Sequence, residues 1–294
     1  MRLSVRHSNL VVRRADDSDI SLPLDDVAVV VASHPAVSLT HAVLAGLAAA
    51  GATFVSCDDR RLPVGMMLPL QGNFVQAERL AAQAAASRPT AKRLWQSIVR
   101  AKIAAQSAAL RLETGDDAGL AAMVARVRSG DPDNIEAQAA RRYWRLFFED
   151  PEFERNRAAE DINGVLNYGY TVLRAMTARA ICAAGLHPCF GLHHHNRYSQ
   201  FTLADDLMEP FRPVVDRAAR DVVRTFGSDA TVDKQTKAVV FEHLLARYEL
   251  DGERRTLFDI LARLATSLVA VFEGRADELC LPRFPKFFPD SAEP

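Results

Sequence analysis

Hydrophobic and polar residues alternate over short stretches in the first part of the chain. These stretches are rich in Val and Leu, are separated by Asp, Ser, Gly or Pro, and cover residues 3–6, 10–14, 20–24, 27–33, 53–58 and 64–70. Alternation of this kind is typical of β-strands. One helix is expected over residues 39–50, with Ser38 as its N-cap and Gly51 at its end. We therefore predict a small β domain over residues 1–75.

From Gln76 onward, hydrophobic residues recur with helical spacing in long segments rich in Ala, Leu and Arg. This spacing predicts helices over residues 74–86, 90–112, 117–129, 132–149, 158–184, 203–225, 231–248 and 254–274. The C-terminal PRFPKFFPDSAEP is rich in Pro and aromatic residues, which is typical of a loose tail or of a peptide that docks on a partner, and we expect residues 286–294 to form a loose tail. The predicted fold is therefore α+β with two domains, the β domain and a larger all-α domain over residues 76–285.

The composition excludes several classes of protein. Hydrophobic residues make up 49% of the chain and charged residues 25%, and the net charge of -1 indicates no particular partner. No apolar run reaches the roughly 18 residues that span a membrane, and the N-terminus is charged where a signal peptide would be apolar. The 4 cysteines form no CxxC pair, so neither a disulfide framework nor a structural zinc site is predicted. These features predict a cytoplasmic protein with no membrane contact.

Positive charge is concentrated in one segment although the total charge is close to zero. No acidic residue lies between Arg79 and Arg111. The basic residues of this strip, which also contains Trp95, are Arg88, Lys92, Arg93, Arg100 and Lys102. Cations in such a strip can bind a phosphate backbone without reading the bases, which suits sequence-tolerant nucleic-acid binding. The alternative is a solvated helix face.

A second basic group lies on the next long helix, which also carries an inward-facing carboxylate. At about 100° per residue, Glu136 shares a stripe with Ala140, Tyr143 and Phe147. Arg141, Arg142 and Arg145 lie on the opposite side. A carboxylate that faces the interior is unfavourable unless it meets a cation, a metal ion or several donors. Either an internal salt bridge, for which Arg174 is a candidate, or a metal site would satisfy Glu136.

The helix predicted over residues 158–184 carries a polar seam. Asn163, Asn167, Tyr170 and Arg174 share one stripe, whereas hydrophobic residues occupy the others. Such a seam is either a satisfied structural network or the lining of a cleft that binds a phosphate or a metal-bound water. In the second case Arg174 would contact the anion.

Three consecutive histidines, residues 193–195 in GLHHHN, precede a cluster of acids. Neighbouring side chains point in different directions, so at most one or two of the histidines can bind one ion. Asp205, Asp206 and Glu209 lie close together on the following helix, where like charges repel. Metal binding would relieve this repulsion, and Arg212 together with the helix N-terminus is the structural alternative.

Convergence of Glu136, one of these histidines and Glu209 would create a site with two oxygen donors and one imidazole. This set suits Mg²⁺ or Mn²⁺ and lacks the thiolates or paired imidazoles of structural zinc. An ion with few protein ligands keeps positions open for phosphate oxygens. The implied chemistry is phosphoryl transfer with activation of an oxygen nucleophile.

The segments LNYGY, GLHHHN and DLMEPFRP occur in this order after DPDNIEAQAARRYW. Together they closely resemble the CRISPR-associated adaptation integrase family, the larger of the two proteins that insert new spacers into a CRISPR array. The resemblance is greatest to the version found with type II systems. It is close over residues 131–216, and the order of the two domains extends it over nearly the whole chain.

The resemblance implies a metal-dependent DNA endonuclease and integrase with a defined set of site residues. The implied metal ligands, which are also the catalytic residues, are Glu136, His194 and Glu209. Asp206 matches an acid that supports the site in relatives, and some relatives have aspartate in place of Glu209. His193 and His195 match variable positions, so we expect them to flank the site or face DNA. The polar seam of Asn163, Asn167, Tyr170 and Arg174 is then expected to line the site.

The resemblance also implies substrates and partners. The substrate is double-stranded DNA, a short prespacer whose 3′ hydroxyls are joined by transesterification to the leader end of the CRISPR array. The family forms homodimers through its β domains, and a small ferredoxin-like partner dimer bridges two of them in a 4:2 complex. Two other functions remain open from the residues alone. One is a DNA-binding scaffold with a degenerate metal site, and the other is an unrelated metal-dependent phosphohydrolase.

Overall fold

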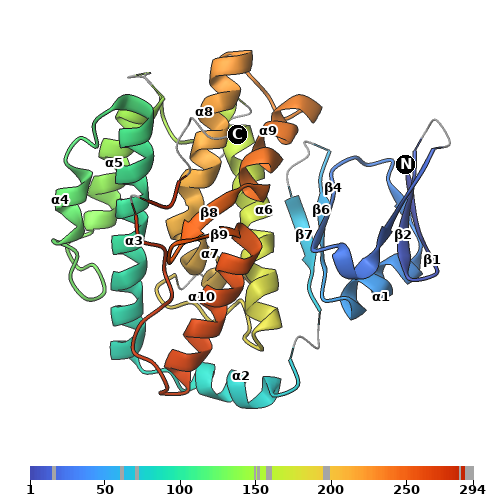
Figure 1. The fold of residues 1–294 in the computed structure, drawn as a ribbon, viewed down its shortest axis with the longest axis horizontal. Coiled ribbons are helices and arrows are strands. Elements are labelled where there is room, and N and C mark those ends of the chain that lie inside the picture. The colour runs from blue at the N-terminus through green and yellow to red at the C-terminus, as the bar shows by residue number, and fades with distance from the viewer. Residues whose placement is uncertain are drawn as a thin grey trace.

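The computed structural model describes residues 1–14, 18–59, 63–69, 73–148, 150, 153–156, 161–194, 199–284 and 286–288. Strands dominate the N-terminal part and helices the remainder, so the predicted α+β class is confirmed. Figure 1 shows the N-terminal strands together with one helix on one side of the molecule, and the remaining helices together with a short hairpin on the other.

Two sheets and one helix form the N-terminal part. The first sheet has the order β3-β2-β1-β5, and its strands are β1 (Arg2–Arg6), β2 (Asn9–Arg13), β3 (Asp19–Pro23) and β5 (Ser38–Leu39). The second has the order β4-β6-β7, with β4 (Val29–Ala32), β6 (Thr53–Cys57) and β7 (Pro63–Met67). Alternation along β1 and β2 turns Leu3 and Leu10 inward, where they pack with Val43 and Leu47 of α1 (His41–Ala49).

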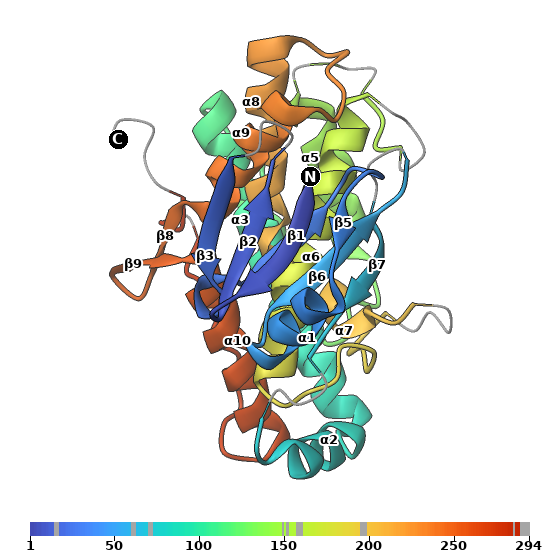
Figure 2. The ribbon, with the colours of Figure 1, turned by 90° about the vertical axis from the view of Figure 1, so that its right-hand side faces the viewer.

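The helical part is built around α6 (Ile162–Ala183), most of which is buried. Helix α6 packs against α7, α8, α9 and α10 and also contacts β4, β6 and β7, so it joins the two parts of the molecule. Figure 2 shows the sheets in front of this helix. The other helices are α2 (Gln76–Ala84), α3 (Arg88–Thr114), α4 (Leu120–Val124), α5 (Ile135–Phe147), α7 (Thr202–Met208), α8 (Arg212–Phe226), α9 (Lys234–Leu245) and α10 (Leu257–Phe272). Within the described ranges, no helix is both long enough and apolar enough to cross a membrane.

A β-hairpin interrupts the helical part, where the sequence pattern predicted only helices. Strands β8 (Arg247–Leu250) and β9 (Glu253–Thr256) pair antiparallel around a turn in which Asp251 and Gly252 both have positive φ. Tyr248 and Leu250 alternate inward and are 2% exposed, so they add to the helical core. The prediction of helices extending to residue 248 and beginning at residue 254 was therefore wrong.

The helix predicted over residues 203–225 is broken in the middle. Helix α7 ends at Met208, a 3₁₀ turn η2 covers Glu209–Phe211, and α8 begins at Arg212. Pro210 and Pro213 have no backbone N–H to donate, which disfavours a continuous helix here. The turn η2 packs against α3, and this contact brings Glu209 toward that helix.

The end of the described chain packs against the hairpin. The ring of Phe287 stacks on Tyr248 with centroids 4.7 Å apart, and Phe287 is 1% exposed. The backbone N–H of Glu249 donates to the carbonyl of Phe287 at 3.2 Å. The expected loose tail is therefore not found at Phe287 and Phe288, which are both buried.

Candidate metal centre

Two of the expected metal ligands, Glu136 and Glu209, face the same lysine. Nζ of Lys102 lies 2.5 Å from Oε1 of Glu136 and 2.6 Å from Oε2 of Glu209. The side chains of Lys102 and Glu209 are 11% and 5% exposed, and that of Glu136 is 22% exposed. Three segments far apart in the sequence, namely α3, the first turn of α5, and η2, therefore meet at one buried ammonium group.

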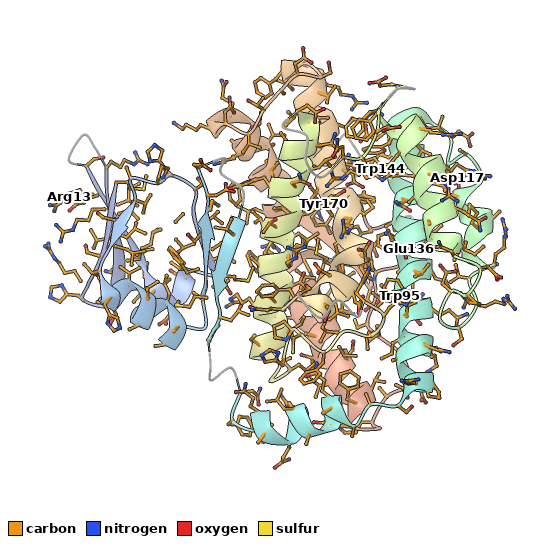
Figure 3. The ribbon with its side chains drawn as sticks, turned by 180° about the vertical axis from the view of Figure 1, so that it is seen from behind. Arg13, Trp95, Asp117, Glu136, Trp144 and Tyr170 are labelled. Atoms are coloured by element: carbon orange, nitrogen blue, oxygen red, sulfur yellow. The ribbon has the colours of Figure 1, made fainter. Side chains whose placement is uncertain are left out.

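The start of α5 is held so that Glu136 points into this cluster. Asp131 accepts hydrogen bonds from the backbone N–H groups of Ile135 and Glu136, at 2.9 and 3.0 Å. Further along the helix, Tyr143 and Phe147 are fully buried and fix the inward stripe. Figure 3 shows Glu136 of α5 next to α3, the helix that carries Trp95.

The alternative partner considered for Glu136 lies elsewhere. Nε of Arg174 is 2.6 Å from Oδ1 of Asp205, so Arg174 pairs with the first acid of the cluster on α7. The salt bridge expected as the structural explanation for Glu136 therefore forms with Lys102 and not with Arg174.

Glu209 is ionised by its surroundings. Burial by itself raises the pKa of this carboxyl, but the positive charges of Arg212 and Lys102 outweigh that effect and lower the pKa to about 2. Nε of Arg212 lies 2.8 Å from Oε1 of Glu209, opposite to the oxygen that faces Lys102. Oε2 is buried, and the group that faces it is the ammonium of Lys102 at 2.6 Å.

Lys102 remains protonated in this environment. Burial lowers the pKa of its ammonium group, but the charges of Glu209 and Glu136 raise it above the ordinary value. The cluster therefore holds the positive charge of Lys102 between the carboxyl groups of Glu136 and Glu209.

Asp206 organises the histidine loop. It is completely buried and accepts hydrogen bonds from the backbone N–H groups of Leu192, His193 and His194, at 2.6, 3.0 and 3.3 Å. Its Oδ1 also lies 2.5 Å from Nδ1 of His194. A carboxylate can only accept, so Nδ1 carries the proton and the lone pair of a neutral imidazole is on Nε2.

The same contact raises the pKa of His194. The hydrogen bond to Asp206 is the main cause, burial opposes it, and the negative charges of Asp206, Glu209 and Glu136 add to it. The third expected ligand is thus oriented by Asp206, and the charges of both glutamates act on its imidazole.

Trp95 is a part of this site that the sequence did not reveal. Its indole stacks on the ring of His193 with centroids 4.3 Å apart and an interplanar angle of 2°, and it meets His194 edge-on at 5.5 Å. Trp95 is 1% exposed, so its indole packs against the histidine loop inside the protein and is not part of the exposed basic strip on α3. The sequence feature that could have revealed it is spacing, because Trp95 and Lys102 are two helical turns apart and therefore lie on the same face of α3.

The polar seam of α6 is largely hydrogen-bonded within the protein. Arg155 donates to the side-chain oxygens of Asn163 and Asn167, at 2.9 and 2.6 Å. Tyr170 donates to Asp216, which also accepts from Tyr143 at 3.0 Å. Of the two interpretations of the seam, a hydrogen-bonded structural network or the lining of a cleft, these contacts correspond to the first. Arg155 was not among the predicted residues.

Asp216 is a buried carboxyl at the end of this network. Burial raises its pKa to about 7, although the hydrogen bonds from Tyr170 and Tyr143 and the charge of Arg212 act in the opposite direction. Next to it, the guanidinium of Arg212 lies over the ring of Tyr170, 4.6 Å from the centroid.

A small pocket of about 90 Å³ adjoins the cluster. Its lining contains three cationic side chains, those of Lys102, Arg155 and Arg212. Trp144, Tyr170 and one carboxyl group, that of Asp216, form part of the remaining wall. The pocket is therefore suited to an anion that approaches the carboxylate pair.

The donor chemistry fits Mg²⁺ or Mn²⁺, but the carboxylates are not gathered for direct coordination. Among the described residues, no three His, Cys, Asp or Glu side chains are close enough together to hold an ion as they stand. Lys102 lies between Glu136 and Glu209. The buried carboxylate of Glu209, which the cations of Lys102 and Arg212 contact, a second carboxylate and an oriented imidazole are nevertheless the donor set that these ions accept.

The predicted basic strip divides into an exposed and a buried part. Arg88, Lys92, Arg93 and Arg100 are exposed along α3, whereas Lys102 is buried. The prediction that Lys102 shares the exposed strip was wrong, because two residues along a helix turn a side chain by about 200°. On α5, a surface groove of about 330 Å³ is lined by Gln138, Arg141, Arg142, Arg145 and Leu146. His195 lies outside the described residues.

Comparison with known proteins identifies the family. Residues 1–244 match the family model described as CRISPR associated protein Cas1. The chain belongs to the Cas1 family. The CRISPR-associated endonuclease Cas1 of Neisseria meningitidis serogroup C (strain 8013) is 35% identical over 289 residues, which cover 96% of this chain and 92% of that protein.

Solved structures share the Cas1 fold seen here. A casposase bound to integration product superposes with a TM-score of 0.79 at 18% identity, covering 98% of this chain and 92% of the casposase. A chain of a Cas6-RT-Cas1–Cas2 complex has a TM-score of 0.77 at 19% identity, covering 97% of this chain and 35% of that one. At these identities the likeness concerns the fold alone.

Proposed function

We propose that this Cas1 protein is a metal-dependent DNA endonuclease and integrase of CRISPR adaptation. It joins the 3′ hydroxyls of short duplex DNA to the CRISPR array by transesterification. The observation that carries this proposal is the meeting of Glu136 and Glu209 at one buried cation beside His194. Further support comes from the endonuclease name of the meningococcal relative and from the integration product bound to the casposase.

Glu136, His194 and Glu209 would hold a Mg²⁺ or Mn²⁺ ion. When bound, such an ion polarises a phosphate and favours the ionised form of an attacking hydroxyl. Asp206 keeps Nδ1 of His194 protonated and directs Nε2 away from itself. A neutral His194 that is not bound to the ion can accept a proton from a hydroxyl.

The adjoining pocket would receive the DNA phosphate. Arg155 and Arg212 present positive charge there, and Arg212 is fixed by both Glu209 and Tyr170. Charge-assisted hydrogen bonds from arginine suit the geometry of phosphate oxygens. Because one phosphodiester replaces another, the reaction needs no external source of energy. Hydrolysis at the same site would nick branched DNA.

Exposed cations on two helices would bind the DNA backbone. Arg88, Lys92, Arg93 and Arg100 lie along α3, and Arg141 and Arg142 line the groove on α5. Binding through these side chains would depend on salt and tolerate many sequences.

The assembly is also part of the proposal. The β part, residues 1–75, would form the homodimer, and the helical part, residues 76–285, would carry the chemistry. A small ferredoxin-like partner dimer would bridge two homodimers in a 4:2 complex. The presence of Cas2 beside Cas1 in the name of the Cas6-RT-Cas1–Cas2 complex supports a partner of this kind.

The decisive experiment is an integration assay on a supercoiled plasmid that bears a leader and one repeat. Purified protein is incubated with short duplex DNA and Mn²⁺, with and without the small partner protein. We expect strand transfer to depend on a free 3′ hydroxyl and on the metal. Normal DNA binding without strand transfer or nicking would favour a scaffold. Turnover of small phosphate esters without duplex DNA would favour an unrelated phosphohydrolase.

A further inference from the structure

Lys102 places a positive charge where the proposed function requires a divalent ion. Its ammonium contacts Oε1 of Glu136 at 2.5 Å and Oε2 of Glu209 at 2.6 Å. These are oxygens of the two carboxylates that would hold the metal. Lys102 therefore competes directly with the ion for two of the three expected ligands.

The charges of the cluster show why a cation is needed there. If Lys102 were neutral, Glu136 would lose the cation that it contacts and Glu209 would keep Arg212 alone, and buried charges without a partner strongly destabilise a fold. Arg212 contacts only Glu209, through the other oxygen. Lys102 is the cation that joins the two carboxylates.

A divalent ion and the ammonium group of Lys102 cannot both contact these oxygens without electrostatic repulsion between them. Two positive centres a few ångströms apart repel strongly in a buried site. An ion that binds Glu136 and Glu209 must therefore either displace the ammonium or bind weakly beside it.

The structure provides a place for the displaced ammonium. Lys102 also lines the 90 Å³ pocket, whose wall contains the guanidinium groups of Arg155 and Arg212 and, as a polar partner for an ammonium, the carboxyl of Asp216. A cavity of this size admits water, which can solvate the ammonium. The four-carbon stem of lysine allows the charge to move without a shift of α3.

We propose that Lys102 is an exchangeable internal counter-cation of the metal site. It neutralises Glu136 and Glu209 in the metal-free protein, and a divalent ion displaces its ammonium into the adjoining pocket. This inference rests on the proposed function, because it takes the two glutamates as metal ligands. The consequence is that Lys102 weakens metal binding while it stabilises the metal-free fold.

The test is the affinity for Mn²⁺, measured in the full chain without DNA by the electron paramagnetic resonance signal of free Mn²⁺. Lys102→Met removes the competing charge, and we expect Mn²⁺ to bind at least about tenfold more tightly than to the unchanged protein. Lys234→Met is the matched control, because Lys234 is exposed at the start of α9 and the change in net charge is the same. An unchanged or lower affinity in Lys102→Met would overturn the proposal.

A third variant separates this inference from the proposed function. If His194→Ala binds Mn²⁺ as tightly as the unchanged protein, the proposed metal site itself is wrong. If His194→Ala loses Mn²⁺ while Lys102→Met gains nothing, the metal site stands and only the role of Lys102 is rejected.

A measurement on the unchanged protein covers the case in which Lys102→Met does not fold. Reductive methylation of lysines is followed by mass spectrometry with and without Mn²⁺. Displacement of the ammonium from its carboxylate partners should accelerate methylation of Lys102 severalfold and leave Lys234 unaffected. A rate at Lys102 that stays the same or falls when Mn²⁺ is added would contradict the proposal.

Discussion

Oδ1 of Asp206 lies 2.5 Å from Nδ1 of His194, and the same carboxylate accepts the backbone N–H groups of three consecutive residues in the histidine loop. One buried side chain thus sets both the path of the loop and the orientation of the imidazole. This arrangement resembles the carboxylate–histidine pairs that orient metal ligands in other proteins.

Replacement of Asp206 by asparagine tests this role. Asp206→Asn keeps the size of the side chain but removes the charge that holds Nδ1 protonated. Loss of such a partner typically weakens metal binding or activity by about 10–100-fold. We expect a decrease of this size in Mn²⁺ affinity and in strand transfer. Asp205→Asn is the control, since Asp205 pairs with Arg174 and not with the loop. Equal losses in both variants would contradict the role of Asp206.

The three histidines should differ in their effect on activity. His194→Ala removes the oriented imidazole, and we expect strand transfer to be abolished. His193→Ala removes a ring that stacks on Trp95, so much of the activity should remain. Both variants are compared in the plasmid integration assay, with thermal unfolding as a check of the fold. If His194→Ala is active, the assignment of the ligand is wrong.

The exposed strip on α3 should govern the salt dependence of DNA binding. Neutralising Lys92, Arg93 and Arg100 together should weaken binding, because each lost phosphate contact lowers the slope of log K against log salt by about 0.9. Fluorescence anisotropy with duplex DNA at several salt concentrations measures the slope.

A control triple variant corrects for the change in total charge. It neutralises three exposed cations on other elements, namely Lys234, Arg247 and Arg263. If both triple variants change the slope equally, the strip is a solvated helix face and not a DNA-binding surface.

The buried carboxyl of Asp216 should make stability depend on pH. Its pKa is raised from 3.8 to about 7 by burial, against the hydrogen bonds from Tyr170 and Tyr143. Between these two values the folded protein keeps a proton that the unfolded chain has released. The free energy of unfolding should therefore fall as the pH rises from about 4 to about 7.

Substitution of Asp216 isolates its contribution. Asp216→Asn cannot ionise, so the decrease in unfolding free energy over this range should be smaller than in the unchanged protein, by an amount on the order of a few kcal/mol. Urea unfolding at several pH values measures the difference, with the exposed Asp229→Asn as the control. An identical pH profile in Asp216→Asn and the unchanged protein would show that another group is responsible.

Local patterns in the sequence predicted the fold class and one essential feature of the site. Alternating and helical spacing report which side of an element avoids water, and so they predicted the β part, the long helices and the inward direction of Glu136. The hairpin β8–β9 was missed because each strand has only 4 residues, and Tyr248 and Leu250 become buried through contacts with distant segments.

The sequence by itself also determined that acids, histidines and a polar seam lie close together along the chain, and the resemblance to a known family assigned them roles. Only the tertiary structure decided which charged side chains form ion pairs with one another. The packing of η2 and α5 against α3 brings Lys102 between Glu136 and Glu209. The loop held by Asp206 of α7 stacks His193 on Trp95 of α3. Periodicity along one element shows the direction of a side chain but not its partner, because the partner comes from another element whose position depends on the whole core.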